Sequence, residues 1–220
     1  AGQVVWHHDI MDLNFSSGEW LILARTNYIA NKIATDLKEQ GYLFWREGSG
    51  WSISPNVLTG IEVWLKLCKG LTVTATELKT LSTLLKSDIV TKSGRKNLAT
   101  LDNEIPYALD DVKENFCTSD LREKPWYEVL KVAEQERIYI TSVRRMGEKI
   151  LTDKPRVKIS TIHKAKGGEA DNVALVLDTS RACAESRDQD SEIRTFYVGM
   201  TRAKKALHLI EKQTRYGFVV

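Results

Sequence analysis

Three short stretches of the sequence carry side chains suited to binding phosphate, and the first is "ILARTN". Arg25 directly follows an apolar run, Trp20 to Ala24, that predicts a strand buried on both faces. In open parallel sheets ligands gather beyond the carboxyl ends of the strands, and the planar donor fork of arginine matches phosphate oxygens. Arg25 is therefore a candidate phosphate ligand. The alternative is an arginine held in a structural ion pair.

The second stretch, "STIHKAKGGEADNV" at 160–173, begins in the last residues of a predicted strand at 157–162. Hydroxyl, imidazole and ammonium groups of this kind contact phosphodiesters, and a glycine pair lets the backbone approach a charged partner closely. The alternative is a surface loop without a ligand, in which the glycines only allow the chain to turn. The candidate residues in this stretch are Thr161, His163, Lys164, Lys166, Gly167 and Glu169.

The third stretch, "TFYVGMTRAKKALHLI" at 195–210, predicts a helix around 191–204 followed by a strand at 206–210. Tyr197 is expected to be buried and Arg202 to project from the helix. Lys204 and Lys205 are expected at its far end, where the helix dipole favours cations. By spacing alone Arg202 is more typical of a solvated helix face. Its occurrence together with the other two stretches favours a phosphate ligand.

A parallel sheet interrupted by a helical insertion is the simplest arrangement of the elements around these stretches. Strands are predicted at 20–24, 157–162, 172–178 and 206–210, with "YLFW" as a further short strand. Residues 71–153 show mainly helical patterns, including a capping box from Thr74 to Glu77 and a helix starting at Pro125 and reaching Ala133. We expect an α/β fold, with residues 1–70 and 154–220 in one domain and 71–153 in an inserted helical subdomain.

Composition excludes several classes of protein. The chain has 220 residues, a net charge of +3 and 42% hydrophobic residues, and no apolar run long enough to cross a membrane. Its three cysteines form no CxxC pair, and His7-His8-Asp9 has no distant partner of matching type, so we expect no metal site. Segment 137–170, with nine basic and three acidic residues, is a candidate surface for a polyanion. We expect a cytoplasmic protein.

No nucleophile elbow, HExxH motif or GxxxxGK[ST] phosphate loop occurs in the sequence. The three stretches, in this order, resemble motifs IV, V and VI in the carboxy-terminal half of the UvrD/Rep/PcrA family of superfamily 1 DNA helicases. The trailing "KQTRYGF" is similar to the segment after motif VI in that family. One departure lies in motif V, where the family has GLEF and this chain has "GGEA".

The resemblance implies a second RecA-like motor domain with an inserted helical subdomain, and it assigns roles to the candidate residues. Arg25 and Arg202 would be the catalytic arginines, reaching the terminal phosphate of ATP held with Mg²⁺ by an amino-terminal RecA-like domain. Gly167 and Glu169 would lie at the nucleotide, with Glu169 at the ribose. Single-stranded DNA would be contacted by Thr161, His163, Lys164 and Lys166.

The parent protein implied by the resemblance is an ATP-dependent 3′ to 5′ DNA helicase that acts on single strands and on junctions of single- and double-stranded DNA in repair or replication. Because the Walker A and Walker B motifs are missing, we expect this chain to be a portion of that protein and to be inactive alone. A non-catalytic helicase-like module that binds nucleic acid or serves as a scaffold is the alternative. A motor inside a helicase-nuclease assembly is a third interpretation.

Overall fold

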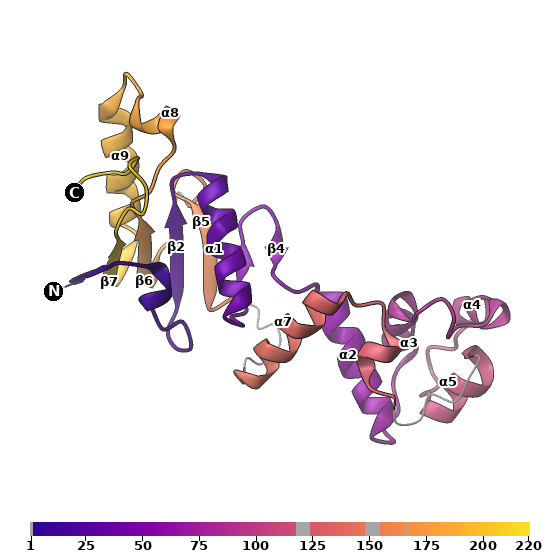
Figure 1. Cartoon of the computed structure of the whole chain (residues 1–220). Helices are drawn as coiled ribbons and strands as arrows, with labels where there is room; N and C mark the ends of the chain where they lie inside the picture. Colours follow the sequence, from indigo (N-terminus) through magenta and orange to yellow (C-terminus); the bar gives the residue numbers. More distant parts are fainter. Residues whose placement is uncertain (1, 118–123, 148–154, 166) are drawn as a thin grey trace. The chain divides into compact units, whose positions relative to one another are not determined.

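The structure, a computed structural model, describes residues 2–117, 124–147, 155–165 and 167–220 (Figure 1). The chain divides into two compact units, which we call the sheet unit, 1–52 with 141–220, and the helical unit, 53–140. The predicted division, 1–70 with 154–220 against 71–153, stays a proposal for the evolutionary domains. By compactness, residues 53–70 cluster with the helices that follow them.

The sheet unit is built on a mostly parallel sheet. Its seven strands in the described part of the chain lie in the order β1-β7-β6-β2-β5-β3-β4, and β4 alone of these runs antiparallel to its neighbour. The strands are β1 Gln3–His7, β2 Trp20–Ala24, β3 Trp45–Arg46, β4 Gly50–Trp51, β5 Val157–Thr161, β6 Ala170–Val176 and β7 Ala203–Ile210. This architecture confirms the predicted α/β fold.

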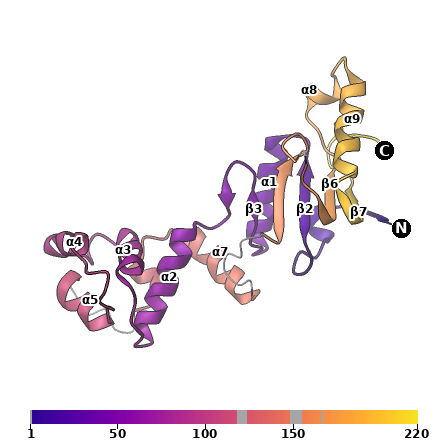
Figure 2. The ribbon, with the colours of Figure 1, turned by 180° about the vertical axis from the view of Figure 1, so that it is seen from behind.

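The central strand β2 is buried along its whole length because both faces of the sheet are covered. Alternate residues of β2 point to opposite faces. Ile22 packs in a core with α1 (Asn27–Glu39), whereas Leu23 packs in a core with Phe196 of α9 (Gln189–Met200). Figures 1 and 2 show α1 beside β2 and β5, and α9 beside β6 and β7. The short 3-10 helix Ile10–Asp12 and helix α8 (Arg181–Ala184) complete the unit.

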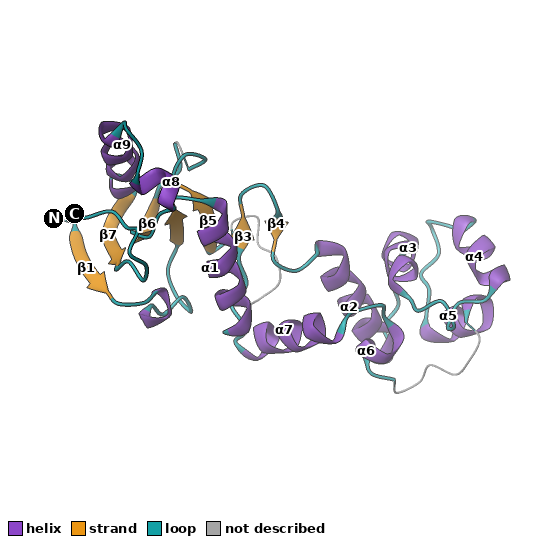
Figure 3. Ribbon diagram, turned by 45° about the horizontal axis from the view of Figure 1, so that its top comes forward, coloured by secondary structure: helices purple, strands orange, loops and turns teal. Residues whose placement is uncertain are grey.

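The helical unit consists of helices and loops among its described residues (Figure 3). The predicted capping box is confirmed: Thr74 accepts a hydrogen bond from Glu77 N, and the Glu77 carboxylate accepts one from Thr74 N. Trp64 is fully buried and donates its indole N–H to the Lys124 carbonyl. The helices are α2 Pro55–Cys68, α3 Ala75–Leu84, α4 Lys92–Ala99, α5 Leu109–Phe116, α6 Trp126–Val129 and α7 Glu134–Arg145, whose last residues belong to the sheet unit.

Several local predictions were wrong. Helix α9 ends at Met200, so Arg202 lies in the turn after the helix, and Lys204 and Lys205 belong to β7 instead of a helix end. Tyr197, expected to be buried, is 64% exposed. Helix α6 stops at Val129, short of the predicted end. Strand β1 was not predicted, because it is an edge strand whose side chains are mostly exposed and show no buried pattern.

Candidate functional site

Arg25 lies at the carboxyl end of β2 and is held by Glu192 near the start of α9. Its Nε donates to Glu192 Oε2 at 2.7 Å and its Nη2 donates to Glu192 Oε1 at 2.6 Å. The two side chains are only 16% and 12% exposed, and the hydrogen bond to the carboxylate raises the pKa of Arg25. The ion pair that the sequence left open as an alternative is therefore present. The predicted nucleotide contact of Arg25 stays a prediction, and it would require this pair to open.

Thr161, His163 and Lys164 lie at the same edge of the sheet, where β5 ends. The Thr161 carbonyl accepts hydrogen bonds from the backbone N–H of Lys164 and of Ala165, so the chain turns sharply after the strand. Thr161 itself is only 8% exposed, whereas His163 and Lys164 are exposed. The turn therefore presents the imidazole and the ammonium to solvent and keeps the threonine inside. Lys166, predicted to contact DNA, lies outside the described residues.

Glu169 and Arg202 both lie at the opposite edge, directly before β6 and β7 begin. The backbone N–H of Ala170 donates to the Arg202 carbonyl at 3.2 Å, so the two predicted nucleotide ligands directly precede adjacent strands. Glu169 is exposed and lies 3.7 Å from the ammonium of Lys204. Gly167 adopts a φ of +87° with open space beside it, a conformation that favours glycine.

The guanidinium of Arg202 is oriented by the last turn of the preceding helix, α9, and by Thr201. Its Nε donates to the Val198 carbonyl at 2.9 Å, and its Nη2 donates to Thr201 Oγ1 at 3.2 Å. Among the described residues no carboxylate pairs with it, in contrast to Arg25. The charge of Arg202 is therefore positioned by neutral acceptors and can still interact with an anion.

The structure does not bring Arg25 and Arg202 together. Ala24 pairs with Thr161 at the carboxyl edge, whereas Ala203 pairs with Ala170 at the amino edge. The backbone positions of Arg25 and Arg202 are separated along the strand direction by at least the length of β2. Its five residues span about 16 Å at roughly 3.3 Å per residue. The backbones of Arg25 and Arg202 therefore lie at opposite edges of the sheet.

The residues at His7-His8-Asp9 are engaged elsewhere. His7 Nε2 lies 2.9 Å from His208 Nδ1, His8 lies 3.1 Å from Glu211, and the Asp9 carboxylate caps the 3-10 helix. Within the described ranges no group of three or more histidine, cysteine, aspartate or glutamate side chains could hold a metal ion. No helix of the same ranges is long and apolar enough to span a membrane.

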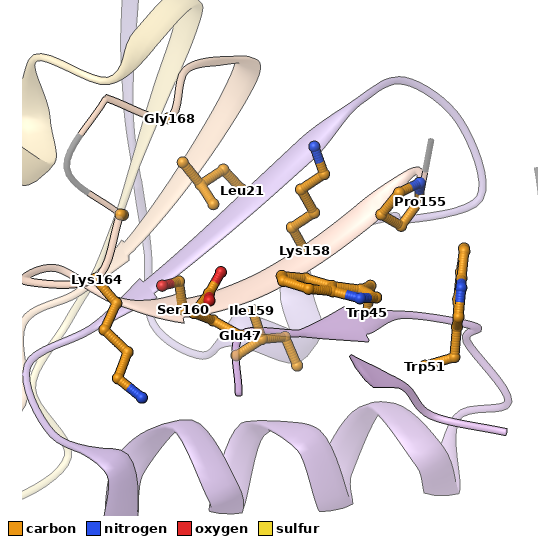
Figure 4. A pocket seen from close by; sticks show the side chains of 11 residues that line it. Leu21, Trp45, Glu47, Trp51, Pro155, Lys158, Ile159, Ser160, Lys164 and Gly168 are labelled. Carbon is orange, nitrogen blue, oxygen red and sulfur yellow. The ribbon is translucent and has the colours of Figure 1, made fainter. Parts of the chain in front are cut away.

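Sequence reasoning missed a cavity on the face of the sheet opposite α1. Figure 4 shows it between the β3-β4 hairpin and the loop that leads from β5 to β6, with the indoles of Trp45 and Trp51 at one side and Lys164 at the other. A usable signal was present in "FWREGSGW", where two tryptophans flank a glycine-rich turn.

The sequence matches the model of one known protein family. The family model described as the UvrD-like helicase C-terminal domain matches residues 73–214, more than half of the chain. None of the curated proteins matches this chain. The chain belongs to the UvrD-like helicase C-terminal domain family, which confirms the resemblance. The matched range includes the second and third stretches, whereas "ILARTN" lies outside it. Membership implies a helicase that uses a nucleotide with Mg²⁺ and binds DNA.

Proposed function

We propose that this chain is the carboxy-terminal motor portion of an ATP-dependent 3′ to 5′ DNA helicase or translocase. In this proposal an amino-terminal RecA-like domain of the same parent protein holds ATP and Mg²⁺. The present chain supplies an arginine to the nucleotide and contacts single-stranded DNA near its junction with duplex. The observation that carries the proposal is the backbone hydrogen bond that joins the strand after Glu169 to Arg202.

The nucleotide side of the proposal is the amino edge of β6 and β7. Glu169 and Arg202 are 33 positions apart in sequence, and their adjacency supports a single binding surface for a ribose and a phosphate. Cleavage of a phosphoanhydride develops negative charge on the transferred phosphoryl oxygens, and a positioned guanidinium stabilises that charge. Arg202 is suited to this role because its hydrogen bonds fix its direction without neutralising it.

The DNA side of the proposal is the carboxyl edge at the end of β5. The exposed His163 and Lys164 are suited to phosphodiester contacts, and Thr161, being buried, would position them through its carbonyl. The loop from β5 to β6 then runs from the DNA side to Glu169 at the nucleotide side. One short segment would thus touch both ligands.

The nucleotide role is tested with Arg202→Ala in a protein that contains both motor domains. Removal of an arginine of this kind lowers hydrolysis by about 10³-fold or more, because the transition-state charge loses its counterion. Binding of a single-stranded oligonucleotide should change little. Arg194→Ala is the matched control, since Arg194 belongs to α9, the helix that precedes Arg202, and is 74% exposed. Unchanged turnover of Arg202→Ala would remove this residue from the nucleotide site.

Two measurements on the chain itself complete the test. The chain alone should hydrolyse ATP at no more than the background rate, and robust DNA-stimulated hydrolysis would overturn the need for a partner domain. Its affinity for a single-stranded oligonucleotide should fall steeply between low and moderate salt, because phosphate contacts release counterions. DNA binding without any effect of Arg202→Ala on turnover would favour the non-catalytic module instead.

A further inference from the structure

The cavity beside the β3-β4 hairpin has a volume of about 490 Å³ and lies wholly within the sheet unit (Figure 4). Trp45 and Trp51 face each other across the antiparallel pair, and Trp45 also lies opposite Lys158 on β5. Gly48 and Gly50 have φ angles of +83° and +80°, which close the hairpin in a turn that favours glycine. The residues lining the cavity include Trp45, Glu47, Trp51, Lys158, Ser160 and Lys164.

The two indoles differ from the buried tryptophans of the chain. Trp20 and Trp64 donate their N–H groups to backbone carbonyls, at 2.8 and 3.0 Å. Trp45 and Trp51 are half-buried and donate to no residue in the described ranges. A half-buried indole keeps a large apolar face and a polar donor available together, which is the combination that binding surfaces use.

The charges around the cavity are also available. Lys158 and Lys164 form no ion pair with any described residue, and the Lys164 ammonium lies beside Gly48 in the hairpin turn, 3.3 Å from where a Cβ would stand. The Ser160 hydroxyl donates to the Thr161 carbonyl at 3.1 Å. Aromatic faces flanked by ammonium groups fit a ligand that has both a flat ring and a phosphate.

We infer that this cavity binds one nucleotide of the single-stranded DNA, with its base against Trp45 or Trp51 and its phosphate near Lys164. The inference rests on the proposed function, because Lys164 belongs both to the cavity and to the turn assigned to the DNA backbone. A DNA strand bound along this turn could place a base against the indoles while its phosphate stays in contact with Lys164. The Glu47 carboxylate at the cavity wall can accept hydrogen bonds from the amino group of a base.

Stacking on an indole tolerates any base, because every base has a π face. The cavity would therefore bind the DNA strand without sequence specificity. It differs from the turn contacts, which need only the phosphates. An oligonucleotide that lacks bases separates the two kinds of contact.

The test measures binding of a labelled 15-nucleotide thymidine oligomer to the full chain. Trp51→Leu should weaken binding about ten-fold, in line with alanine substitutions at stacking residues, whereas Trp51→Phe should retain most of the affinity. Trp6→Leu is the matched control, since Trp6 is a half-exposed tryptophan of β1 outside the cavity. Circular dichroism and thermal unfolding establish that each variant is folded.

An oligomer of the same length with an abasic centre should bind more weakly to the unsubstituted chain and show little response to Trp51→Leu. A second measurement needs no variant: an oligomer carrying 5-iodouracil is photocrosslinked to the chain, and the attachment site is mapped by mass spectrometry. Crosslinks at Trp45 or Trp51 support the inference.

Three results overturn the inference. The first is salt-dependent binding of the oligomer whose affinity is the same for Trp51→Leu as for the unsubstituted chain, together with crosslinks outside Trp45 and Trp51. In that case the proposed DNA contacts at His163 and Lys164 remain and the cavity has no role in binding. The second is binding of free thymidine monophosphate as tightly as the oligomer, which would make the cavity a mononucleotide site. The third is no binding of any oligomer, which contradicts the DNA side of the proposed function itself.

Discussion

The ion pair between Arg25 and Glu192 joins the end of β2 to the first turn of α9, and its loss should be measurable as a loss of stability. Both side chains are mostly buried, at 16% and 12% exposure, and the guanidinium donates two hydrogen bonds of 2.7 and 2.6 Å. Truncation of either residue leaves the other charge with little access to water. The cost then includes the desolvation of the remaining ion, as well as the lost attraction.

The burial of the pair sets the expected magnitude. Exposed ion pairs contribute about 0–1 kcal/mol, whereas removal of one partner of a buried pair costs about 3–5 kcal/mol. Because this pair retains some exposure, we expect Arg25→Ala and Glu192→Ala each to lower the free energy of unfolding by about 3 kcal/mol. The double variant should cost little more than either single variant, which gives a coupling energy of about 2–3 kcal/mol.

The assay is a double-mutant cycle followed by urea denaturation of the chain. The matched control is the pair formed by Arg181 of α8 and Glu185, the residue that follows α8. These side chains lie 2.9 Å apart but are 69% and 55% exposed, and their coupling should not exceed about 0.5 kcal/mol. A coupling for Arg25 and Glu192 as small as that of the control would refute the view that this pair fixes α9.

The same variants test the predicted nucleotide contact of Arg25 in a protein with both motor domains. If Arg25 touches the nucleotide, Arg25→Ala should lower hydrolysis far more than Glu192→Ala does at an equal loss of stability. If Arg25 only holds α9, the two variants should lower hydrolysis to the same extent.

Two further predictions concern side chains outside the proposed site. Burial, and the nearby charge of His7, lower the pKa of His208 below its ordinary value, so the unfolded chain takes up a proton that the folded chain resists. Stability should therefore fall as the pH drops below about 6.5, the ordinary value for histidine, and the fall should be smaller in His208→Gln; urea midpoints at pH 7.5 and 5.5 measure both. An equal fall in the two proteins would exclude His208 as its source. Burial raises the pKa of the Cys117 thiol to about 11, so at pH 8 only about one thiol in a thousand is ionised. Iodoacetamide should alkylate Cys117 more slowly than Cys183 by peptide mass spectrometry, and modification of Cys117 at an equal or higher rate would contradict the burial of its sulfur.

The central part of the fold could be predicted because its signals are local and strong. The run from Trp20 to Ala24 is apolar at every position, as expected for a short strand covered on both faces, and the structure buries all five residues. The capping box at Thr74 and Glu77 likewise acts between residues three apart. Strand β1 gave no such signal, because an edge strand with exposed side chains carries little hydrophobic pattern.

The errors around Arg202 have a physical cause in the overlap of two periodicities. The apolar residues within 203–210 are compatible either with a helix that continues past Arg202 or with a strand, because the run is short. Pairing with β6 on one side and β1 on the other selects the strand. The partner of Arg25 could not be predicted from pattern at all, since Glu192 is 167 positions away and only the folded sheet brings α9 to the end of β2.

Helix α9 connects the positions of Arg25 and Arg202. Glu192, in its first turn, is fixed to Arg25 at the carboxyl edge of the sheet, and Arg202 follows its last residue at the amino edge. Twelve helical residues at about 1.5 Å each span roughly 18 Å, close to the roughly 16 Å length of the five-residue strand β2. Gly199 packs against Leu175 so closely that a Cβ would lie 3.0 Å from its Cδ1, which holds the second end of the helix against β6. A displacement at the carboxyl edge that moves Arg25 would therefore reach Arg202 at the amino edge through α9.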